Sequence, residues 1–222
     1  MEKIAIIGAG AAGCFCAVEM KRRRPGAQIT VFESATKPLA KVAITGGGRC
    51  NLTNSFESIG RLREAYPRGE RLVRHAFSQL SPEQTCAWWE REGVRLVTME
   101  DGCVFPASQD AMQIVRTLEN LMRRAGLRED IRWAEMGSKG ISRLACTLTA
   151  DAYSIAGRCH FKEEFVTAGG VSADAVLPKA FEAREHPHLH FAGEVLDIDA
   201  ITGGFNLQAA WSTAYTVAAQ AE

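Results

Sequence analysis

A glycine pattern near the N-terminus restricts the possible folds of this chain more than any other part of its sequence. Positions 8–13 read G-A-G-A-A-G, directly after a short apolar run at residues 3–7 and at the start of a helical pattern over residues 11–24. Residues 28–33 predict a second strand. Because a strand, a helix and a strand in this order form a right-handed crossover, we expect a β-α-β unit with parallel strands.

Each glycine of this pattern has a distinct role in a dinucleotide-binding unit. Gly8 permits the turn, Gly10 lets the backbone approach a pyrophosphate, and Gly13 allows close contact between helix and strand. Glu33 stands twenty residues after Gly13, where its carboxylate can accept hydrogen bonds from both ribose hydroxyls and would repel a 2′-phosphate. The pattern therefore favours FAD or NAD over NADP, although glycines in such a pattern can also be purely structural.

Composition excludes several other classes of protein. The 222 residues include 26 Lys and Arg against 26 Asp and Glu, so no net charge attracts nucleic acid or an anionic membrane. The apolar stretch at residues 4–18 is interrupted by glycines and is shorter than the roughly 20 residues that span a bilayer. We expect a cytoplasmic protein with neither a nucleic-acid nor a membrane partner.

Cysteine, histidine and tryptophan suggest packing more than chemistry. The seven cysteines include no C-x-x-C pair, so we expect reduced thiols and no metal. Cys14 and Cys16 fall on the first predicted helix, and Trp88 and Trp89 fall on another predicted helix. We expect all four side chains to pack in the interior. Histidines at 186, 188 and 190 would share one face of a strand, which leaves a transition-metal site as the weaker interpretation.

Further elements follow from periodicity and turn signals. We expect helices over 70–80, 82–92, 132–148 and 205–219, and a helix capped by Ser108 that ends near Gly126. Strands are expected over 94–99, 103–105, 153–155, 161–167 and 188–192, the first two as a hairpin. Residues 34–54 read as one long polar loop, and loops of that length usually have a function.

Two more glycine-rich segments have the chemistry of cofactor contacts. Residues 46–49 read G-G-G-R and offer backbone donors beside a guanidinium that can bind phosphate oxygens, unless they are only a flexible turn. A Gly-Gly step at 203–204 introduces the last helix. Such a helix start can hold an anion, including the edge of a reduced flavin, although a plain surface turn is the alternative.

Four stretches combine into a more specific pattern: IAIIGAGAAG at 4–13, KVAITGGGRCNLTN at 41–54, FVTAGGV at 165–171 and LHFAGEVLDIDAITGGFNLQAAW at 189–211. Together they resemble bacterial flavoproteins known as BaiN-like, aminoacetone oxidase family or HI0933-like NAD(P)/FAD-dependent oxidoreductases. The resemblance implies an α/β fold with a doubly wound, Rossmann-like FAD-binding sheet of the glutathione-reductase type.

The resemblance also implies a set of cofactor-binding residues. The ADP part of FAD would be held by Gly8, Gly10, Ala11, Ala12, Gly13 and Glu33. Residues placed along the cofactor are Arg49, Cys50 and Asn51. Those placed near the ribityl chain and isoalloxazine are Gly193, Glu194, Gly204, Phe205 and Asn206.

The chain departs from this family in its length. Members are nearly twice as long, and after Gly126 they continue with further strands and an inserted β-rich domain over the flavin. Here residue 127 onward resembles the segment that follows the insert. We therefore expect residues 1–126 and 127–222 to form two parts of one FAD-binding domain that lacks most of the insert. The skipped part would have supplied a sheet strand, and residues 164–170 are our hypothesis for its replacement.

The function implied is that of an FAD-dependent oxidoreductase. Electrons or a hydride would pass between a nicotinamide or small organic substrate and the flavin, with no general base required of the protein. The family suggests oxidation of a small amine or reduction of a conjugated enone, with NAD(P)H as donor in some members. The alternatives are a truncated, non-catalytic remnant that binds nucleotide and an NAD-only dehydrogenase.

Overall fold

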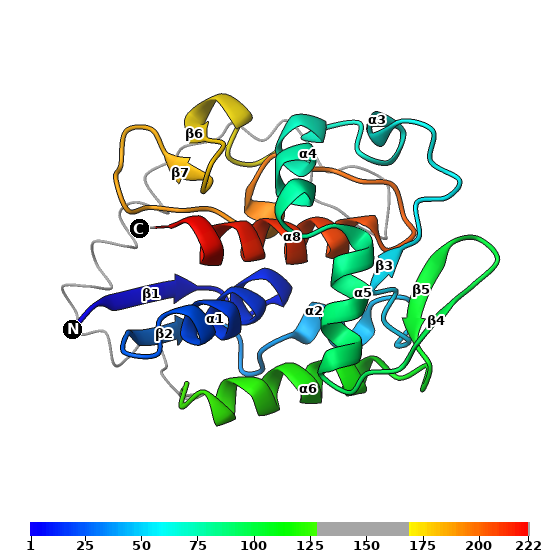
Figure 1. Ribbon diagram of the computed structural model, residues 1–222, viewed down its shortest axis with the longest axis horizontal. Helices are drawn as coiled ribbons and strands as arrows, with labels where there is room; N and C mark the ends of the chain where they lie inside the picture. The colour runs from blue at the N-terminus through cyan, green and yellow to red at the C-terminus, as the bar shows by residue number, and fades with distance from the viewer. Residues whose placement is uncertain (128–168, 222) are drawn as a thin grey trace, which may run out of the picture.

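The N-terminal β-α-β unit has the predicted form in the computed structural model, which describes residues 1–127 and 169–221 (Figure 1). Strand β1 (Lys3–Ile7) leads into helix α1 (Ala11–Arg23), and β2 (Gln28–Phe32) returns parallel to β1. The strands pair in register from Lys3 with Gln28 to Ile7 with Phe32. The predicted parallel unit is therefore confirmed.

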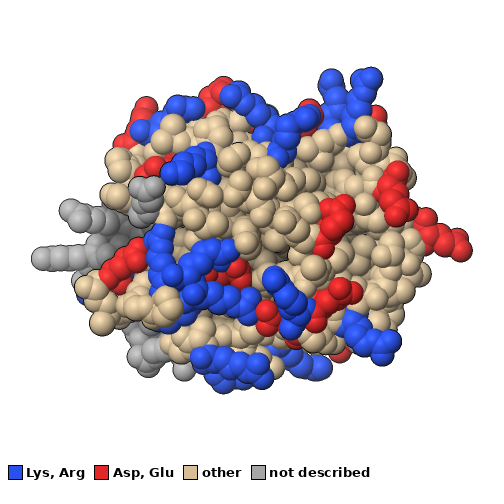
Figure 2. Space-filling model, viewed as in Figure 1, with Lys and Arg blue, Asp and Glu red and all other residues tan. Residues whose placement is uncertain are grey.

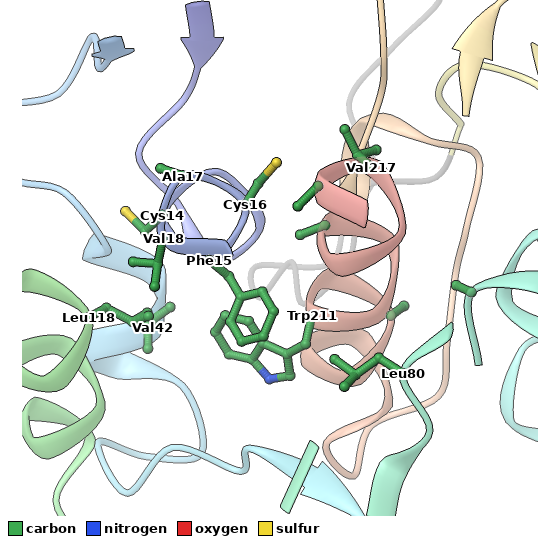
Figure 3. Packing of buried hydrophobic residues seen from close by; sticks show 14 of the residues in the cluster. Cys14, Phe15, Cys16, Ala17, Val18, Val42, Leu80, Leu118, Trp211 and Val217 are labelled. Carbon is green, nitrogen blue, oxygen red and sulfur yellow. The ribbon is translucent and has the colours of Figure 1, made fainter. Parts of the chain in front are cut away.

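The core lies between α1 and α8 (Phe205–Gln220), which come from opposite ends of the chain and pack against each other (Figure 1). Figure 3 shows Phe15 on α1 and Trp211 on α8 directed toward one another, and their ring centroids are 5.5 Å apart. Both rings are fully buried. Trp88 joins this cluster 4.6 Å from Phe15, which confirms that the Trp88-Trp89 pair packs in the core.

Three predicted helices surround this core. They are α4 (Glu70–Gln79), α5 (Pro82–Arg91) and α6 (Ala111–Arg124). The predicted cap of α6 was wrong. Asp110 is the N-cap and accepts from the Met112 N–H at 2.9 Å, whereas the Ser108 hydroxyl bonds to Gln113. Ser108 cannot be the N-cap because Gln109 has a left-handed backbone conformation, with a φ of 53°, and the helix begins only after Asp110.

Residues 34–54 are not one continuous loop. They contain the short helix α2 (Ala40–Ile44), which packs against α6, and strand β3 (Thr53–Asn54). Strand β3 pairs with the predicted hairpin, whose strands are β4 (Leu96–Thr98) and β5 (Cys103–Pro106), in the antiparallel order β3-β5-β4. The remaining short elements are α3 (Leu62–Ala65), η2 (Ala173–Ala175), β6 (Val176–Leu177), β7 (Glu182–Ala183) and η3 (Gly193–Val195).

The strand predicted at 188–192 was wrong. Only His190 forms an isolated bridge, to Glu182, while His188 has a φ of 66° that breaks an extended conformation. The three imidazoles therefore do not share a strand face, and the His190 Nδ1 lies 3.0 Å from the Ala180 carbonyl oxygen. Among the described residues, no three His, Cys, Asp or Glu side chains group as metal ligands would.

Within residues 1–127 and 169–221, the parallel sheet consists of β1 and β2 alone. The predicted helix at 132–148, the strands at 153–155 and 161–167, and most of the 164–170 segment lie outside the described residues. Of that last segment, Gly169 and Gly170 are described and belong to no strand. No helix in the described ranges is long and apolar enough to cross a membrane.

A buried polar network fixes α8 against its neighbours. The Gln208 carboxamide accepts from the Thr53 hydroxyl at 2.5 Å and donates to the Thr85 and Ser212 hydroxyls at 2.9 and 2.8 Å. All four side chains are completely buried. Because hydrophobic contact is not directional, these bonds help to fix the rotation of α8 relative to β3 and α5.

Replacing Gln208 by Leu should therefore destabilise the protein. The change leaves the Thr53 and Thr85 hydroxyls buried without their partner, which costs about 2 kcal/mol or more of unfolding free energy. Urea unfolding at neutral pH measures the loss. Gln220→Leu on the same helix is the control, because Gln220 is only partly buried and bonds only to Gln79 among the described side chains. Equal stability of the two variants would contradict the role given to the network.

A buried carboxylate links α1 to α5 at the edge of the core. Glu19 is 4% exposed and binds Arg23, Arg22 (3.0 Å) and the Trp88 indole N–H (2.9 Å). Figure 2 shows Lys and Arg side chains gathered over α1, with fewer acidic side chains beside them. Burial alone would raise the pKa of Glu19, but the hydrogen bonds from Arg23 and Trp88 and the two positive charges lower it below 4.5.

This lowered pKa predicts how stability changes with pH. The ionised carboxylate stabilises the folded state above the ordinary pKa of 4.5, and that contribution disappears as pH falls through the lower folded-state pKa. We expect Glu19→Gln to be less stable than wild type at pH 7 and the difference to shrink in acid. Urea unfolding from pH 7 to pH 3 measures it, with Glu90→Gln on the exposed side of α5 as control. A difference that is constant with pH would contradict this prediction.

Candidate functional site

Glycine permits an unusually close approach of α1 to β1. A Cβ built on Gly13 would lie 1.9 Å from the Gly8 carbonyl oxygen, so no other residue fits there without movement. Gly8 has a φ of 95°, in the region that favours glycine, and its N–H donates to the Phe32 carbonyl at 2.7 Å. The turn and packing roles predicted for these two glycines are confirmed.

The N-terminus of α1 is open. Its N-cap is Gly10, which provides no side-chain cap, and the first turn carries no acidic residue. Helices α5 and α6 differ, because Ser81 and Asp110 cap them with side-chain oxygens. A Cβ on Gly10 would meet nothing within 4 Å. The arrangement leaves the first N–H groups of α1 and their partial positive charge for an anion.

Glu33 stands beside this helix end. One carboxylate oxygen, Oε2, accepts from the Ala9 N–H at 2.7 Å, and the other, Oε1, accepts from the Ala35 N–H at 2.8 Å. Burial raises the pKa of Glu33, but the backbone donors of Ala35 and Ala9 outweigh this effect and lower it. Glu33 therefore carries its negative charge at neutral pH next to the glycine turn.

The C-terminal half of the chain reaches the same helix end. Gly193 in η3 has a φ of 79°, and a Cβ there would lie 2.8 Å from the Ala12 Cβ. The Gly193 N–H donates to the Thr213 hydroxyl of α8 at 2.9 Å, while Lys41 of α2 pairs with Glu194 at 3.1 Å. Segments predicted separately at the two ends of the chain are thus brought together by α8.

A second group of predicted residues gathers at the start of α8. Gly204 has a φ of 89°, and a Cβ there would lie 2.2 Å from the Thr53 carbonyl oxygen. The Asn51 amide, in the orientation that satisfies both of its ends, donates to that carbonyl at 3.0 Å and accepts from the Gly204 N–H at 3.2 Å. Asn206 bonds both backbone groups of Ala200, at 3.1 and 3.2 Å.

Other predicted residues have their side chains engaged elsewhere. The Arg49 guanidinium lies 4.6 Å from the Phe105 ring centroid. Cys50 is fully buried, and burial raises the pKa of its thiol to about 12, which keeps it protonated. Phe205 is buried, and its carbonyl accepts from the Tyr66 hydroxyl at 2.7 Å. Contact of these residues with a cofactor stays a prediction.

Some supporting residues were missed from the sequence. Thr213 holds the Gly193 turn, and the Asn54 amide donates to the Gly203 carbonyl at 3.0 Å. The position of Thr213 among the alanines of a buried helix is the sequence feature that could have indicated its role. Lys41 begins the stretch at 41–54, but no local pattern links it to Glu194, which is 153 residues away.

Comparison with known proteins identifies the family to which this chain belongs. The sequence profile described as HI0933-like protein Rossmann domain matches residues 2–148 and 131–220. Ribosomal RNA dihydrouridine synthase of Escherichia coli (strain K12) is 31% identical over 108 residues, which cover 49% of this chain and 27% of that protein. The 3-dehydro-bile acid delta(4,6)-reductase of Clostridium scindens is 29% identical over 124 residues, 56% of this chain and 29% of that protein.

These matches span less than a third of the length of either relative. Among solved structures, Thermovibrio ammonificans THI4 aligns over 57% of this chain and 36% of that chain, with 14% identity and a TM-score of 0.33. That score is too low to support an argument, so the family match is the informative result.

The close approach at Gly13 gives a stability prediction. Gly13→Ala should lower the unfolding free energy by about 3 kcal/mol, because the added methyl overlaps the Gly8 carbonyl. Thermal or urea unfolding measures the effect. Gly26→Ala is the matched control, since a Cβ there meets nothing within 4 Å. A Gly13→Ala protein as stable as the control would show that α1 does not need this contact.

Proposed function

Because the chain belongs to the HI0933-like Rossmann-domain family of FAD-dependent oxidoreductases, we propose that it binds FAD and transfers electrons or a hydride between a nicotinamide or small organic substrate and the flavin. We further propose that residues 1–126 and 127–222 are two parts of one doubly wound FAD-binding domain. The observation that carries the proposal is the open N-terminus of α1 beside the ionised Glu33.

The residues present fit the adenosine diphosphate part of FAD. Two phosphates need positive charge and N–H donors at close range, and the uncapped first turn of α1 offers both without a side chain at Gly10. A ribose needs an acceptor for its hydroxyls, and Glu33 offers one at the end of the neighbouring strand. The same carboxylate disfavours a 2′-phosphate by charge repulsion.

The flavin end of the cofactor would lie along the second group of residues. We assign it to the backbone around Gly193, Glu194 and Gly204, with the amides of Asn51 and Asn206 fixing the local chain. Bound FAD supplies the redox chemistry, because its ring system accepts and gives up a hydride. The protein contributes orientation, exclusion of water and N–H groups that favour negative charge.

The activities for which the two relatives are named suggest a substrate class. Formation of dihydrouridine is the reduction of a carbon–carbon double bond of uridine that is conjugated to a carbonyl group. A delta(4,6)-reductase of a 3-dehydro bile acid likewise reduces a carbonyl-conjugated double bond, in a steroid ketone. We propose that the substrate is a small molecule with a carbonyl-conjugated double bond, and that a nicotinamide supplies the electrons.

The second candidate is a non-catalytic nucleotide-binding remnant. It is favoured by one observation, which is that the matches cover only 27% and 29% of the relatives. The flavin content and the activity of the purified protein distinguish the enzyme from the remnant. A yellow protein whose flavin spectrum survives gel filtration, and which oxidises NADPH or NADH anaerobically with a steroid enone, supports the enzyme. Nucleotide binding without flavin supports the remnant.

Gly10→Val should abolish FAD retention while preserving the fold. Gly10 has a φ of −82° and open space where a side chain would begin, so valine is tolerated by the protein but occupies the space proposed for the pyrophosphate. Gel filtration followed by absorbance and mass measurement of released FAD tests this. Gly26→Val is the matched control and should retain the cofactor. Equal FAD content in wild type and Gly10→Val would contradict the assignment.

A further inference from the structure

The backbone of Ala9, between the first two glycines of the turn, is held from both sides. Its N–H donates to Glu33 Oε2 at 2.7 Å. Its carbonyl accepts from the Leu39 N–H at 2.8 Å and from the Cys14 thiol at 3.3 Å. Leu39 is 1% exposed and has a φ of 56°, so the segment after Glu33 folds back onto the turn.

From these contacts we propose that Glu33 is a positioning residue for the phosphates of an adenine dinucleotide, acting through its bond to Ala9, in addition to accepting ribose hydroxyls. This inference rests on the proposed function. A glycine-flanked residue has a large conformational freedom in the absence of restraint. The carboxylate removes part of that freedom before the ligand arrives, which lowers the entropy lost on binding.

The hydrogen-bonding capacity of Glu33 allows both roles. An ionised carboxylate has about four lone-pair positions. Oε1 accepts from the Ala35 N–H and, at 3.3 Å, from the Ser34 hydroxyl, and the Ser34 N–H also lowers the pKa of the carboxyl, whereas Oε2 accepts from the Ala9 N–H. Oε2 therefore keeps one position for a ribose hydroxyl while it holds Ala9. A second hydroxyl can replace Ser34, which lies at the exposed side.

The position of Ala9 explains why the restraint acts on phosphate. Ala9 directly precedes Gly10, the N-cap of α1, so its conformation sets the direction of the first free N–H groups. Loss of the Ala9 bond should therefore weaken ligands that carry phosphates more than ligands that end at the ribose. The lowered pKa of Glu33 is consistent with a carboxylate that bonds backbone donors at neutral pH.

Calorimetric titration with ADP and with adenosine separates the two roles. Glu33→Ala should weaken adenosine binding by about 10- to 100-fold, the loss expected for charge-assisted hydrogen bonds. It should weaken ADP binding by about a further tenfold, through the disordered turn. Glu33→Gln keeps an oxygen that can accept from Ala9, while the exposed Ala35 N–H turns to water. We expect Glu33→Gln to bind adenosine about as weakly as Glu33→Ala does. The further tenfold loss that is specific to ADP should largely disappear in Glu33→Gln.

A second measurement works without any ligand. In wild type the exchange of the Ala9 amide hydrogen should be slow, in Glu33→Gln intermediate and in Glu33→Ala fast. Ser34→Ala is the control, because it removes the longest bond to the carboxylate and leaves the Ala9 bond in place. It should leave the ADP-to-adenosine affinity ratio and the Ala9 exchange rate as in wild type.

The outcomes distinguish this inference from the proposed function. Equal losses for ADP and adenosine in Glu33→Ala, or an Ala9 exchange rate that does not respond to substitution, would overturn the positioning role while leaving FAD binding intact. Wild-type protein that binds neither ADP nor FAD would overturn the proposed function, and the inference with it.

Discussion

The close contact between α1 and the end of β1 sets the position of both the candidate site and the core. Gly13 has no side chain where a Cβ would lie 1.9 Å from the Gly8 carbonyl oxygen. Because the helix begins this close to the strand, its first N–H groups lie at the carboxyl end of the β1–β2 pair, next to Glu33. The opposite side of α1 then presents Phe15 to the core.

Two kinds of interaction bring the ends of the chain together at this helix. Burial of aromatic rings between α1 and α8 supplies the driving force, but it specifies little about orientation. Directional bonds supply the orientation: the Trp211 indole donates to the Leu52 carbonyl at 3.0 Å, and Thr213 accepts from Gly193 at 2.9 Å. Gly193 consequently packs against Ala12 in the first turn of α1.

Local sequence was a good guide where local physics decides the conformation. The hairpin around residues 100–102 and the helices α4, α5 and α8 follow from turn residues, caps and periodicity. It failed where contacts from elsewhere decide. The 188–192 segment alternates like a strand, yet its backbone bonds to Phe181 and to the two-residue strand β7, which is too short to support a longer strand, and His188 lies in the left-handed region. Helix α2 forms within a glycine-rich segment because α6 covers its buried side.

We could predict from the residues alone the β-α-β start, the turn at Gly8 and the acidic residue at the end of β2, because spacing along a short chain segment sets all three. Three contacts became visible only in the folded chain: Glu33 bonds Ala9, Gly193 packs against Ala12, and Asn51 bonds Gly204. The Ala9–Glu33 bond joins residues 24 positions apart across the end of the β1–β2 pair. The Gly193–Ala12 and Asn51–Gly204 contacts, 181 and 153 positions apart, depend on how α8 packs, and no local preference encodes that packing.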